Sequence, residues 1–260
     1  MNTGAVVDLI YCDHAATSFP KPVQVTEAIT RALTESSASP GRSAHRMSLT
    51  AARIIFDARE AVAQLINGED SSRIAFTANV TQALNIALLG FMRHGDHVLT
   101  TSLEHNSVMR PLSWLMEDRG VTVEFIACPD GGRADPAEFR RKINTRTRLA
   151  IVNHASNVTG VIQPLKEIKA ALGSIPLLVD AAQTAGAVPL NVMDGQGDLL
   201  AFTGHKSLLG PTGTGGLWIS PDYEIESVLR GGTGSRSEHE EHPDFMPDPV
   251  SYTHLTLPTN

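Results

Sequence analysis

A lysine between an apolar run and a glycine-rich stretch is the residue of this sequence best suited to covalent chemistry. Lys206 lies in FTGHKSLLGPTGTGGLWI, residues 202 to 219, directly after the apolar residues 199–202. The stretch is not the phosphate-binding loop G-x-x-x-x-G-K-[ST], because His205 precedes the lysine. Two interpretations remain. A lysine that is desolvated in a pocket can form a Schiff base with a carbonyl compound, whereas the commoner alternative is a surface lysine at a strand end.

Short apolar runs alternate with amphipathic segments along most of the chain. We expect helices over residues 20–36, 48–66, 81–92, 107–119, 135–143 and 164–172. We expect strands over residues 73–77, 97–101, 121–128, 148–154, 176–180, 198–203 and 215–220. Strands separated by helical crossovers predict an α/β fold with a mostly parallel, doubly wound sheet that is covered on both faces.

Polar residues follow five of the predicted strands. The segments are 78–81, 102–106, 155–160, 180–183 and 204–206. In a doubly wound sheet, ligands bind at the carboxyl ends of the strands. Because the five segments share this edge, we interpret them as one ligand site, with the start of the helix after residue 79 as an anion-binding end.

The residue types in these segments suit pyridoxal 5′-phosphate. Lys206 could form the imine, Asp180 could pair with the protonated pyridine nitrogen, and His105 could stack on the ring. Candidate donors to the ring oxygen are Asn157 and Gln183, and candidate phosphate ligands are Thr81, Thr203 and His205.

The motifs DHAATSFPKP, SPGRSAHRMS, EHNSVMRPL, NHASNVTG, DAAQTAG and TGHKSLLGPTGTGG resemble the class V aminotransferase group, specifically the cysteine desulfurases and selenocysteine lyases. The resemblance runs from about residue 10 to residue 248. It implies a homodimeric pyridoxal-phosphate enzyme of the fold type I transferases. Such an enzyme takes sulfur from L-cysteine as an enzyme persulfide, leaves L-alanine and serves sulfur metabolism, including iron–sulfur cluster assembly.

The resemblance also assigns roles to individual residues. Lys206 would be the Schiff-base lysine and His105 the stacking residue, and both would be catalytic. The implied cofactor-binding residues are Val80, Thr81, His105, Asn157, Asp180, Gln183, Thr203, His205 and Lys206, with Gly232 and Thr233 of RGGTGS reaching the phosphate of the neighbouring subunit. One departure is His14, because the family usually has asparagine there, near the substrate entrance.

The other departure is at the end of the sequence. We expect an N-terminal segment at 1–18, a pyridoxal-phosphate-binding large domain at 19–249 and a tail at 250–260 that does not resemble the family. Family chains continue into a small C-terminal domain with the nucleophilic cysteine and an arginine for the substrate carboxylate. We expect this domain to be missing here and the activity of the chain to be impaired.

The composition and charge of the sequence argue against several classes of protein. The net charge of −7 argues against a nucleic-acid-binding surface, and no apolar run has the length of a membrane span or a signal peptide. We therefore expect a cytoplasmic protein. Cys12 and Cys128 are expected to be buried, inert thiols, and His239 and His242 to lie in an acidic loop and not in a metal site.

Two alternatives to cysteine desulfuration stay open. The chain could be another class V enzyme, such as a selenocysteine lyase, an aminotransferase or a β-eliminating lyase. It could also be a fragment that binds the cofactor without catalysis. The expected partners are a small amino-acid substrate, a second copy of the chain and a sulfur-acceptor protein.

Overall fold

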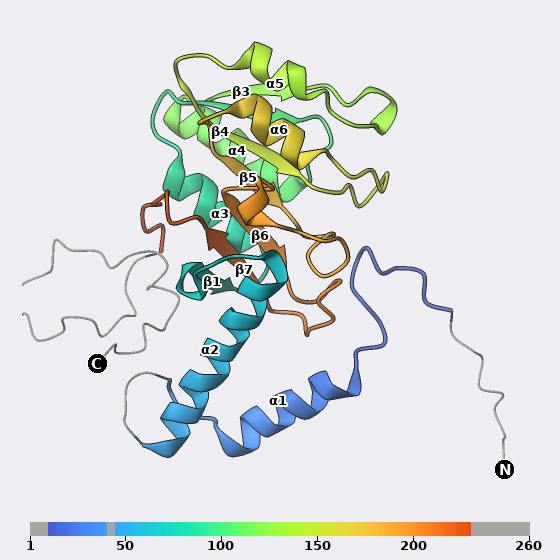
Figure 1. Ribbon diagram of the computed structural model, residues 1–260, viewed down its shortest axis with the longest axis vertical. Helices are drawn as coiled ribbons and strands as arrows, with labels where there is room; N and C mark the ends of the chain where they lie inside the picture. Colours follow the sequence, from blue (N-terminus) through green and yellow to red (C-terminus); the bar gives the residue numbers. More distant parts are fainter. Residues whose placement is uncertain (1–9, 41–44, 230–260) are drawn as a thin grey trace, which may run out of the picture.

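A seven-stranded sheet forms the centre of the computed structural model, which describes residues 10–40 and 45–229 (Figure 1). The strands are β1 (Ile74–Thr77), β2 (His97–Thr101), β3 (Thr122–Ile126), β4 (Thr147–Asn153), β5 (Leu177–Asp180), β6 (Leu199–Thr203) and β7 (Gly215–Ile219). Their order is β1-β7-β6-β5-β4-β2-β3. Only β7 runs antiparallel to its neighbours, β1 and β6, so the predicted mostly parallel sheet is confirmed.

The six predicted helices also form, with ends within three residues of those predicted. They are α1 (Val23–Glu35), α2 (Arg46–Ile66), α3 (Val80–Phe91), α4 (Asn106–Arg119), α5 (Pro136–Lys142) and α6 (Leu165–Leu172). Short 3-10 turns cover Ser71–Arg73, Pro129–Gly131 and Val192–Asp194. The largest difference is at α1, which begins after Pro22 because that residue has an extended backbone with ψ of 140°.

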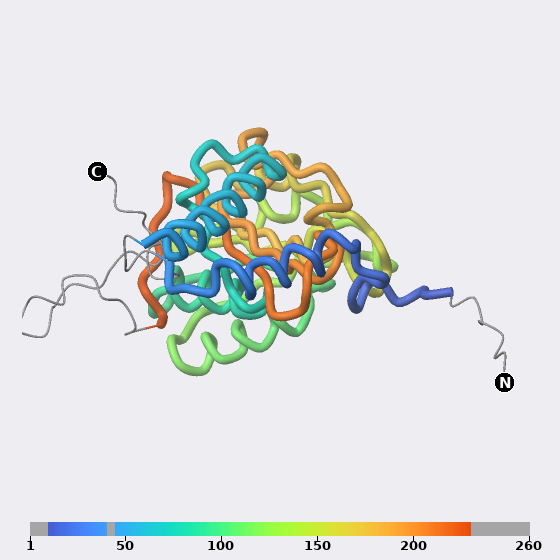
Figure 2. The backbone as a smooth tube through the Cα atoms, turned by 90° about the horizontal axis from the view of Figure 1, so that it is seen from below, coloured from blue at the N-terminus to red at the C-terminus, as the bar shows by residue number. Residues whose placement is uncertain are grey.

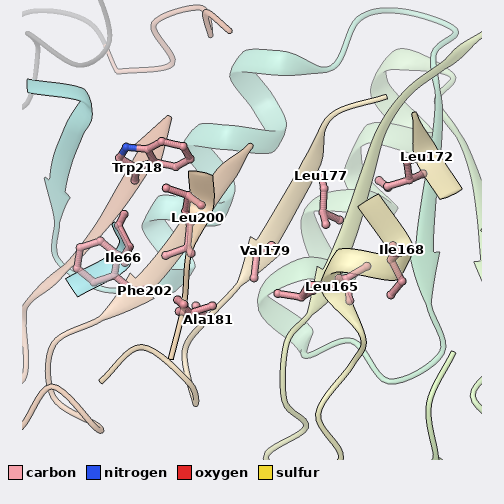
Figure 3. Close-up of a cluster of buried hydrophobic side chains, with 14 of the residues drawn as sticks. Ile66, Leu165, Ile168, Leu172, Leu177, Val179, Ala181, Leu200, Phe202 and Trp218 are labelled. Atoms are coloured by element: carbon pink, nitrogen blue, oxygen red, sulfur yellow. The ribbon is translucent and has the colours of Figure 1, made fainter. Parts of the chain in front are cut away.

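The two faces of the sheet bury separate apolar clusters. Leu177 and Val179 of β5 point to one face and Leu178 to the other, as the two-residue period of a strand requires. The first face packs on α5, α6 and the end of α2, and the cluster includes Phe139 of α5. Figure 3 shows Ile66 of α2 and Ile168 of α6 in this cluster. The second face packs on α3 and α4. The sheet is therefore doubly wound, as predicted.

Helix α1 and most of α2 lie beyond the β1 end of the sheet (Figure 1). None of the thirteen residues of α1 is buried. The chain before α1 takes a different course and lies beside the segment that follows β6 (Figure 2). The N-terminal segment, residues 10–22, therefore reaches the carboxyl edge of the sheet.

Among the described residues, no helix combines the length and apolar character needed to cross a lipid bilayer. The same part of the chain contains no group of three histidine, cysteine or acidic side chains arranged to hold a metal ion. His239 and His242 lie outside the described residues.

Candidate active site

A cavity of about 250 Å³ opens at the carboxyl ends of the strands. The predicted site residues on its wall are Val80, Thr81, His105, Asn157, Asp180, Gln183, Thr203, His205 and Lys206. Residues that the sequence did not single out also line it, among them Ala16, Ser107 and Asn153. Gly232 and Thr233 lie outside the described residues. The fold thus gathers every predicted site residue that the structure describes.

Asp180 ends β5 and is 2% exposed. Its Oδ1 accepts a hydrogen bond from the backbone amide of Ala182 at 2.9 Å. Burial raises the pKa of this carboxyl, whereas the amide and the charges of His105 and Lys206 act in the opposite direction. A buried carboxylate of this kind is suited to a positively charged partner in the cavity.

Lys206 follows β6, is half-buried and lines the same cavity. Burial lowers the pKa of its ammonium, and the charge of Asp180 partly offsets this effect. A lowered pKa leaves more of the amine uncharged and nucleophilic near neutral pH. The structure therefore favours the desolvated lysine over the exposed surface lysine that the sequence left as an alternative.

His105 is the N-cap residue of α4. Its Nδ1 accepts a hydrogen bond from the amide of Ser107 at 3.1 Å and lies 2.8 Å from the Ser107 hydroxyl. The same hydroxyl is 2.8 Å from the hydroxyl of Thr81 on α3. Ser107 therefore fixes the imidazole and joins the two helix starts. Its place two residues after a capping residue was the sequence signal for this role.

The start of α3 lines one end of the cavity and has the geometry that could bind an anion. Asn79 caps the helix by accepting from the amide of Gln82 at 2.9 Å, and Val80 and Thr81 line the cavity. Amides in the first helical turn have no partner within the helix, which suits a phosphate or another anion. Gly215 of β7 makes this arrangement possible, because a Cβ there would lie 2.7 Å from the Asn79 carbonyl carbon.

Two of the predicted phosphate ligands already have protein partners. The buried Thr203 hydroxyl donates to the carbonyl oxygen of Thr214 at 3.3 Å. The Nδ1 of His205 lies 3.1 Å from the hydroxyl of Thr17. Burial lowers the pKa of His205, and the charges of Lys206 and Lys21 add to this effect. These effects favour the neutral form of the His205 imidazole.

Asn157 and Gln183, the predicted donors to a ring oxygen, differ in their surroundings. Asn157 is exposed at the rim, whereas the amide nitrogen of Gln183 donates to the carbonyl oxygen of Ala15 at 3.0 Å. Gln183 thus ties the N-terminal segment to the site. His14 is exposed beside Tyr11, with the two ring centroids 5.0 Å apart, and its effect on substrate stays a prediction.

Glu104, which was not among the predicted site residues, is half-buried and has an enclosed carboxyl oxygen. Its Oε1 accepts from the Thr101 hydroxyl at 2.6 Å and the Asn153 amide at 3.0 Å, and its buried Oε2 has no partner among the described residues. Burial raises the pKa of Glu104 to about 8 against these two hydrogen bonds, with a further increase from the charge of Asp180. In the sequence, Glu104 could have been identified by its position next to His105 and three residues after the predicted strand 97–101.

The two cysteines have different environments. Cys128 is buried in the core, as predicted, but Cys12 is exposed, so the prediction for Cys12 was wrong. The apolar residues before Cys12 suggested burial, but residue 12 belongs to an irregular segment that no helix or strand covers. Neither thiol, and no arginine of residues 10–40 and 45–229, lines the cavity.

The polar and charged groups that line the cavity determine which kind of ligand could bind there. The start of α3 and the nearby hydroxyls suit an anionic group, while the buried Asp180 suits a protonated ring nitrogen. Lys206 can attach an aldehyde covalently, because its amine has a lowered pKa. A flat, phosphorylated aromatic aldehyde would satisfy all three groups.

Comparison with known proteins identifies the family. The model of the family described as Aminotransferase class-V matches residues 10–259. A probable cysteine desulfurase of Methanothermobacter thermautotrophicus is 39% identical over 231 residues, which cover 86% of this chain and 57% of the relative. Cysteine desulfurase IscS 1 of Archaeoglobus fulgidus is 35% identical over 91% of this chain and 63% of its own length.

Solved structures give the same result. The apo cysteine desulfurase of Thermococcus onnurineus NA1 matches with a TM-score of 0.81 and 35% identity, over 86% of this chain and 57% of that chain. A complex of the cystine C-S lyase C-DES with its product cysteine persulfide matches with a TM-score of 0.75 and 30% identity, over 85% and 60%. The chain thus spans about three fifths of the length of these relatives. It belongs to the class-V aminotransferase family, and its sheet corresponds to the large domain of the cysteine desulfurases.

Proposed function

We propose that this chain is the cofactor-binding domain of a cysteine desulfurase and binds pyridoxal 5′-phosphate through Lys206 and Asp180. The observation that carries the proposal is the pairing of these two residues. Asp180 ends β5, Lys206 lies three residues after the adjacent strand β6, and the two residues share one cavity and influence each other's pKa. The similarity to cysteine desulfurases supports this assignment over other lysine chemistry.

Pyridoxal phosphate, when bound, supplies an electron sink next to the amino group of the substrate. Asp180 would stabilise the protonated ring nitrogen by charge and hydrogen bonding. Lys206 would hold the cofactor covalently and, once released by the substrate amine, would move the proton at the substrate α-carbon. His105, fixed by Ser107, would cover one face of the ring.

The remaining residues would bind the periphery of the cofactor. Val80 and Thr81 would present the first amides of α3 to the phosphate, with Thr203 and His205 beside them. We propose that Gly232 and Thr233 of a second copy complete the phosphate site in a homodimer. Asn157 and the second amide hydrogen of Gln183 would donate to the ring oxygen.

The proposed reaction converts L-cysteine and an acceptor thiol into L-alanine and a persulfide. The carbon–sulfur bond breaks, a sulfur–sulfur bond forms, and the alanine β-carbon gains a proton. Because neither cysteine nor any described arginine lines the cavity, we expect weak turnover by this chain alone. The persulfide would serve a sulfur-acceptor protein in the cytoplasm, for uses such as iron–sulfur cluster assembly.

Borohydride trapping tests the cofactor assignment. The chain is incubated with pyridoxal phosphate and reduced, and the modified lysine is mapped by mass spectrometry. We expect the adduct on Lys206 and no adduct there in Lys206→Ala, with unchanged far-ultraviolet circular dichroism. Lys142→Ala is the matched control, because Lys142 binds Glu124 and the Phe125 carbonyl far along the sheet at β3. An adduct on another lysine alone would contradict the proposal.

A second candidate is β-elimination from a sulfur amino acid. The observation that favours it is the similarity to the cystine C-S lyase, a structure with cysteine persulfide bound. Assays with L-cysteine and L-cystine separate the two reactions, since desulfuration gives alanine and β-elimination gives pyruvate. Cofactor attachment without either product would support a binding fragment.

A further inference from the structure

We infer that Lys21 is a positioning residue for Lys206, acting with Thr17 and Ser18 through the carbonyl oxygen of His205. This oxygen belongs to the peptide group that leads directly into Lys206. The inference rests on the proposed role of Lys206 and adds a function for the N-terminal segment, which lies beside the chain that follows β6 (Figures 1 and 2).

Four donors converge on the His205 carbonyl oxygen. The Lys21 ammonium donates at 2.7 Å, the Thr17 hydroxyl at 3.0 Å, and the Ser18 hydroxyl and amide each at 3.1 Å. The Lys21 ammonium also donates to the Ser18 hydroxyl at 2.7 Å. A carbonyl oxygen has two lone pairs, so the four donors share its acceptor capacity, and the charged Lys21 ammonium makes the shortest of the four contacts. Together these contacts anchor the peptide group.

The peptide groups on both sides of this anchor are fixed by other contacts. The Gly204 amide donates to the Thr214 carbonyl at 2.8 Å, and the Gly204 carbonyl accepts from the Gly210 amide at 2.7 Å. The Lys206 carbonyl accepts from the Leu209 amide at 2.9 Å. The backbone of Lys206 is therefore held before and after the residue, while its side chain lines the cavity.

Lys21 is the strongest donor of the four. Burial lowers the pKa of its ammonium, and its charge lowers the pKa of His205. The Lys21 ammonium thus acts both on the carbonyl group of His205, which leads into Lys206, and on the His205 imidazole. A lysine that must attack a carbonyl group gains rate from a fixed starting position, and a displacement of about 1 Å can cost about a hundredfold.

The test compares Lys21→Met, which removes the charged donor at similar length, with Lys21→Arg, which retains a charged donor. Lys142→Met is the matched control, because Lys142 also donates to a backbone carbonyl, that of Phe125, at 2.9 Å. The first readout is the rate at which borohydride-trappable pyridoxal phosphate appears on Lys206. We expect Lys21→Met to slow it about tenfold, Lys21→Arg to restore most of the rate, and Lys142→Met to leave it unchanged.

The second readout needs no cofactor. Acetic anhydride labels lysines in their uncharged form, so mass spectrometry across pH gives the titration midpoint of Lys206, with the exposed Lys166 as internal reference. The titratable groups that share the cavity with Lys206 are His105, Asp180 and His205. Release of the anchored peptide would expose the amine, so we expect the Lys206 midpoint to rise in Lys21→Met and to stay in Lys21→Arg.

Unchanged trapping and an unchanged Lys206 midpoint in Lys21→Met would overturn the inference. If Lys21→Met does not fold, Thr17→Val removes another of the four donors and must slow trapping while Lys142→Met does not. A parent chain without any Lys206 adduct would instead contradict the proposed function. In that case the acetic anhydride titration still decides whether Lys21 positions Lys206.

Discussion

Asp180 and Lys206 illustrate how burial and charge compete at single residues. Burial favours the uncharged form of each side chain, and the charge of each favours the ionised form of the other. The pKa of the Asp180 carboxyl group is raised and the pKa of the Lys206 amine is lowered, so both values lie closer to neutral pH than those of exposed groups. Such pairs are typical of sites that do chemistry.

Replacing Asp180 by Asn should weaken pyridoxal phosphate binding about tenfold or more, which corresponds to about 1.4 kcal/mol per factor of ten. The physical reason is the loss of the negative charge opposite the ring nitrogen. The same change removes the charge that raises the pKa of Lys206, so the acetic anhydride midpoint of Lys206 should fall. Absorbance titration measures the affinity. Asp57→Asn, at an exposed ion pair with Arg53, should leave both unchanged.

Glu104 predicts a pH dependence of stability. The unfolded chain loses the Glu104 proton near its ordinary pKa of 4.5, whereas the folded chain keeps it until about pH 8. Glu104 binds more protons in the folded state in this interval, so its contribution to the free energy of unfolding falls as the pH rises, by at most about 1.4 kcal/mol per unit. Burial lowers the pKa of His154 from 6.5 to about 4, which gives the opposite slope below about pH 6.5, so the slope due to Glu104 is measured between about pH 6.5 and 8. Urea unfolding measures this slope.

Glu104→Gln should remove that slope. Glu124→Gln is the control, because its contact with Lys142 lowers the pKa of Glu124 and its contribution is lost only as the pH falls through that lowered value. The parent slope persisting in Glu104→Gln would show that Glu104 is ionised in the folded state at neutral pH.

At the level of single residues, the sequence indicated site residues near the ends of strands. It did not indicate residues that contact the site from a distant part of the sequence. Asp180 ends a predicted strand, and Lys206 and His105 lie within four residues of the end of one, so position and chemistry together indicated them. Lys21 contacts the His205 carbonyl across 184 positions, and no local pattern contains such a contact. The exposure of Cys12 escaped prediction for the same reason, because it depends on what covers residues 10–22.

Among the helices and strands, α3 lines the cavity with its first residues and β7 packs against the start of α3. Gly215 lets β7 approach the first turn of α3, where the phosphate would bind. The hydrophobic periodicity predicted both elements, because it is a local property of 10 to 20 residues. The antiparallel direction of β7 and its place between β1 and β6 depend on strand pairing across the chain, and these were not predictable from periodicity.

Gly215→Ala should displace the start of α3. A Cβ at this position would lie 2.7 Å from the carbonyl carbon and 2.8 Å from the Cα of Asn79, and neither backbone atom can move alone. We expect a loss of about 1–3 kcal/mol in the free energy of unfolding and a weaker affinity for pyridoxal phosphate.

Gly90→Ala is the matched control for this element. Its Cβ would lie 2.5 Å from the carbonyl oxygen of Glu226, remote from the cavity, so it should lower stability without a specific loss of affinity. Equal affinities in the two variants would show that the start of α3 does not bind the cofactor.

The molecule as a whole leaves part of its apolar surface uncovered within the described residues. On α1, Val23 is 62%, Ile29 41% and Leu33 67% exposed. Apolar residues gathered on a helix without a buried side typically pack against another surface. We therefore expect the isolated chain to bind an environment-sensitive dye such as 1-anilinonaphthalene-8-sulfonate.

The double variant Ile29→Glu and Leu33→Glu should reduce the dye fluorescence by at least half. Met193→Glu is the control, since Met193 is similarly exposed at 54% but lies in a 3-10 turn away from α1. Circular dichroism checks that α1 persists. Fluorescence that is unchanged in the double variant would place the dye elsewhere.

The position of β7 also sets an order of events during synthesis. Within residues 10–40 and 45–229, β1 pairs with β7 alone, whose residues leave the ribosome about 140 positions later. Until then β1 has no hydrogen-bonded neighbour in the sheet, and the glycine contact that seats the start of α3 is absent. The parallel strands β2, β3, β4 and β5 can pair earlier. A nascent chain would thus acquire its anion-binding end last, so that the vitamin B6 derivative could be captured only after the sheet is complete.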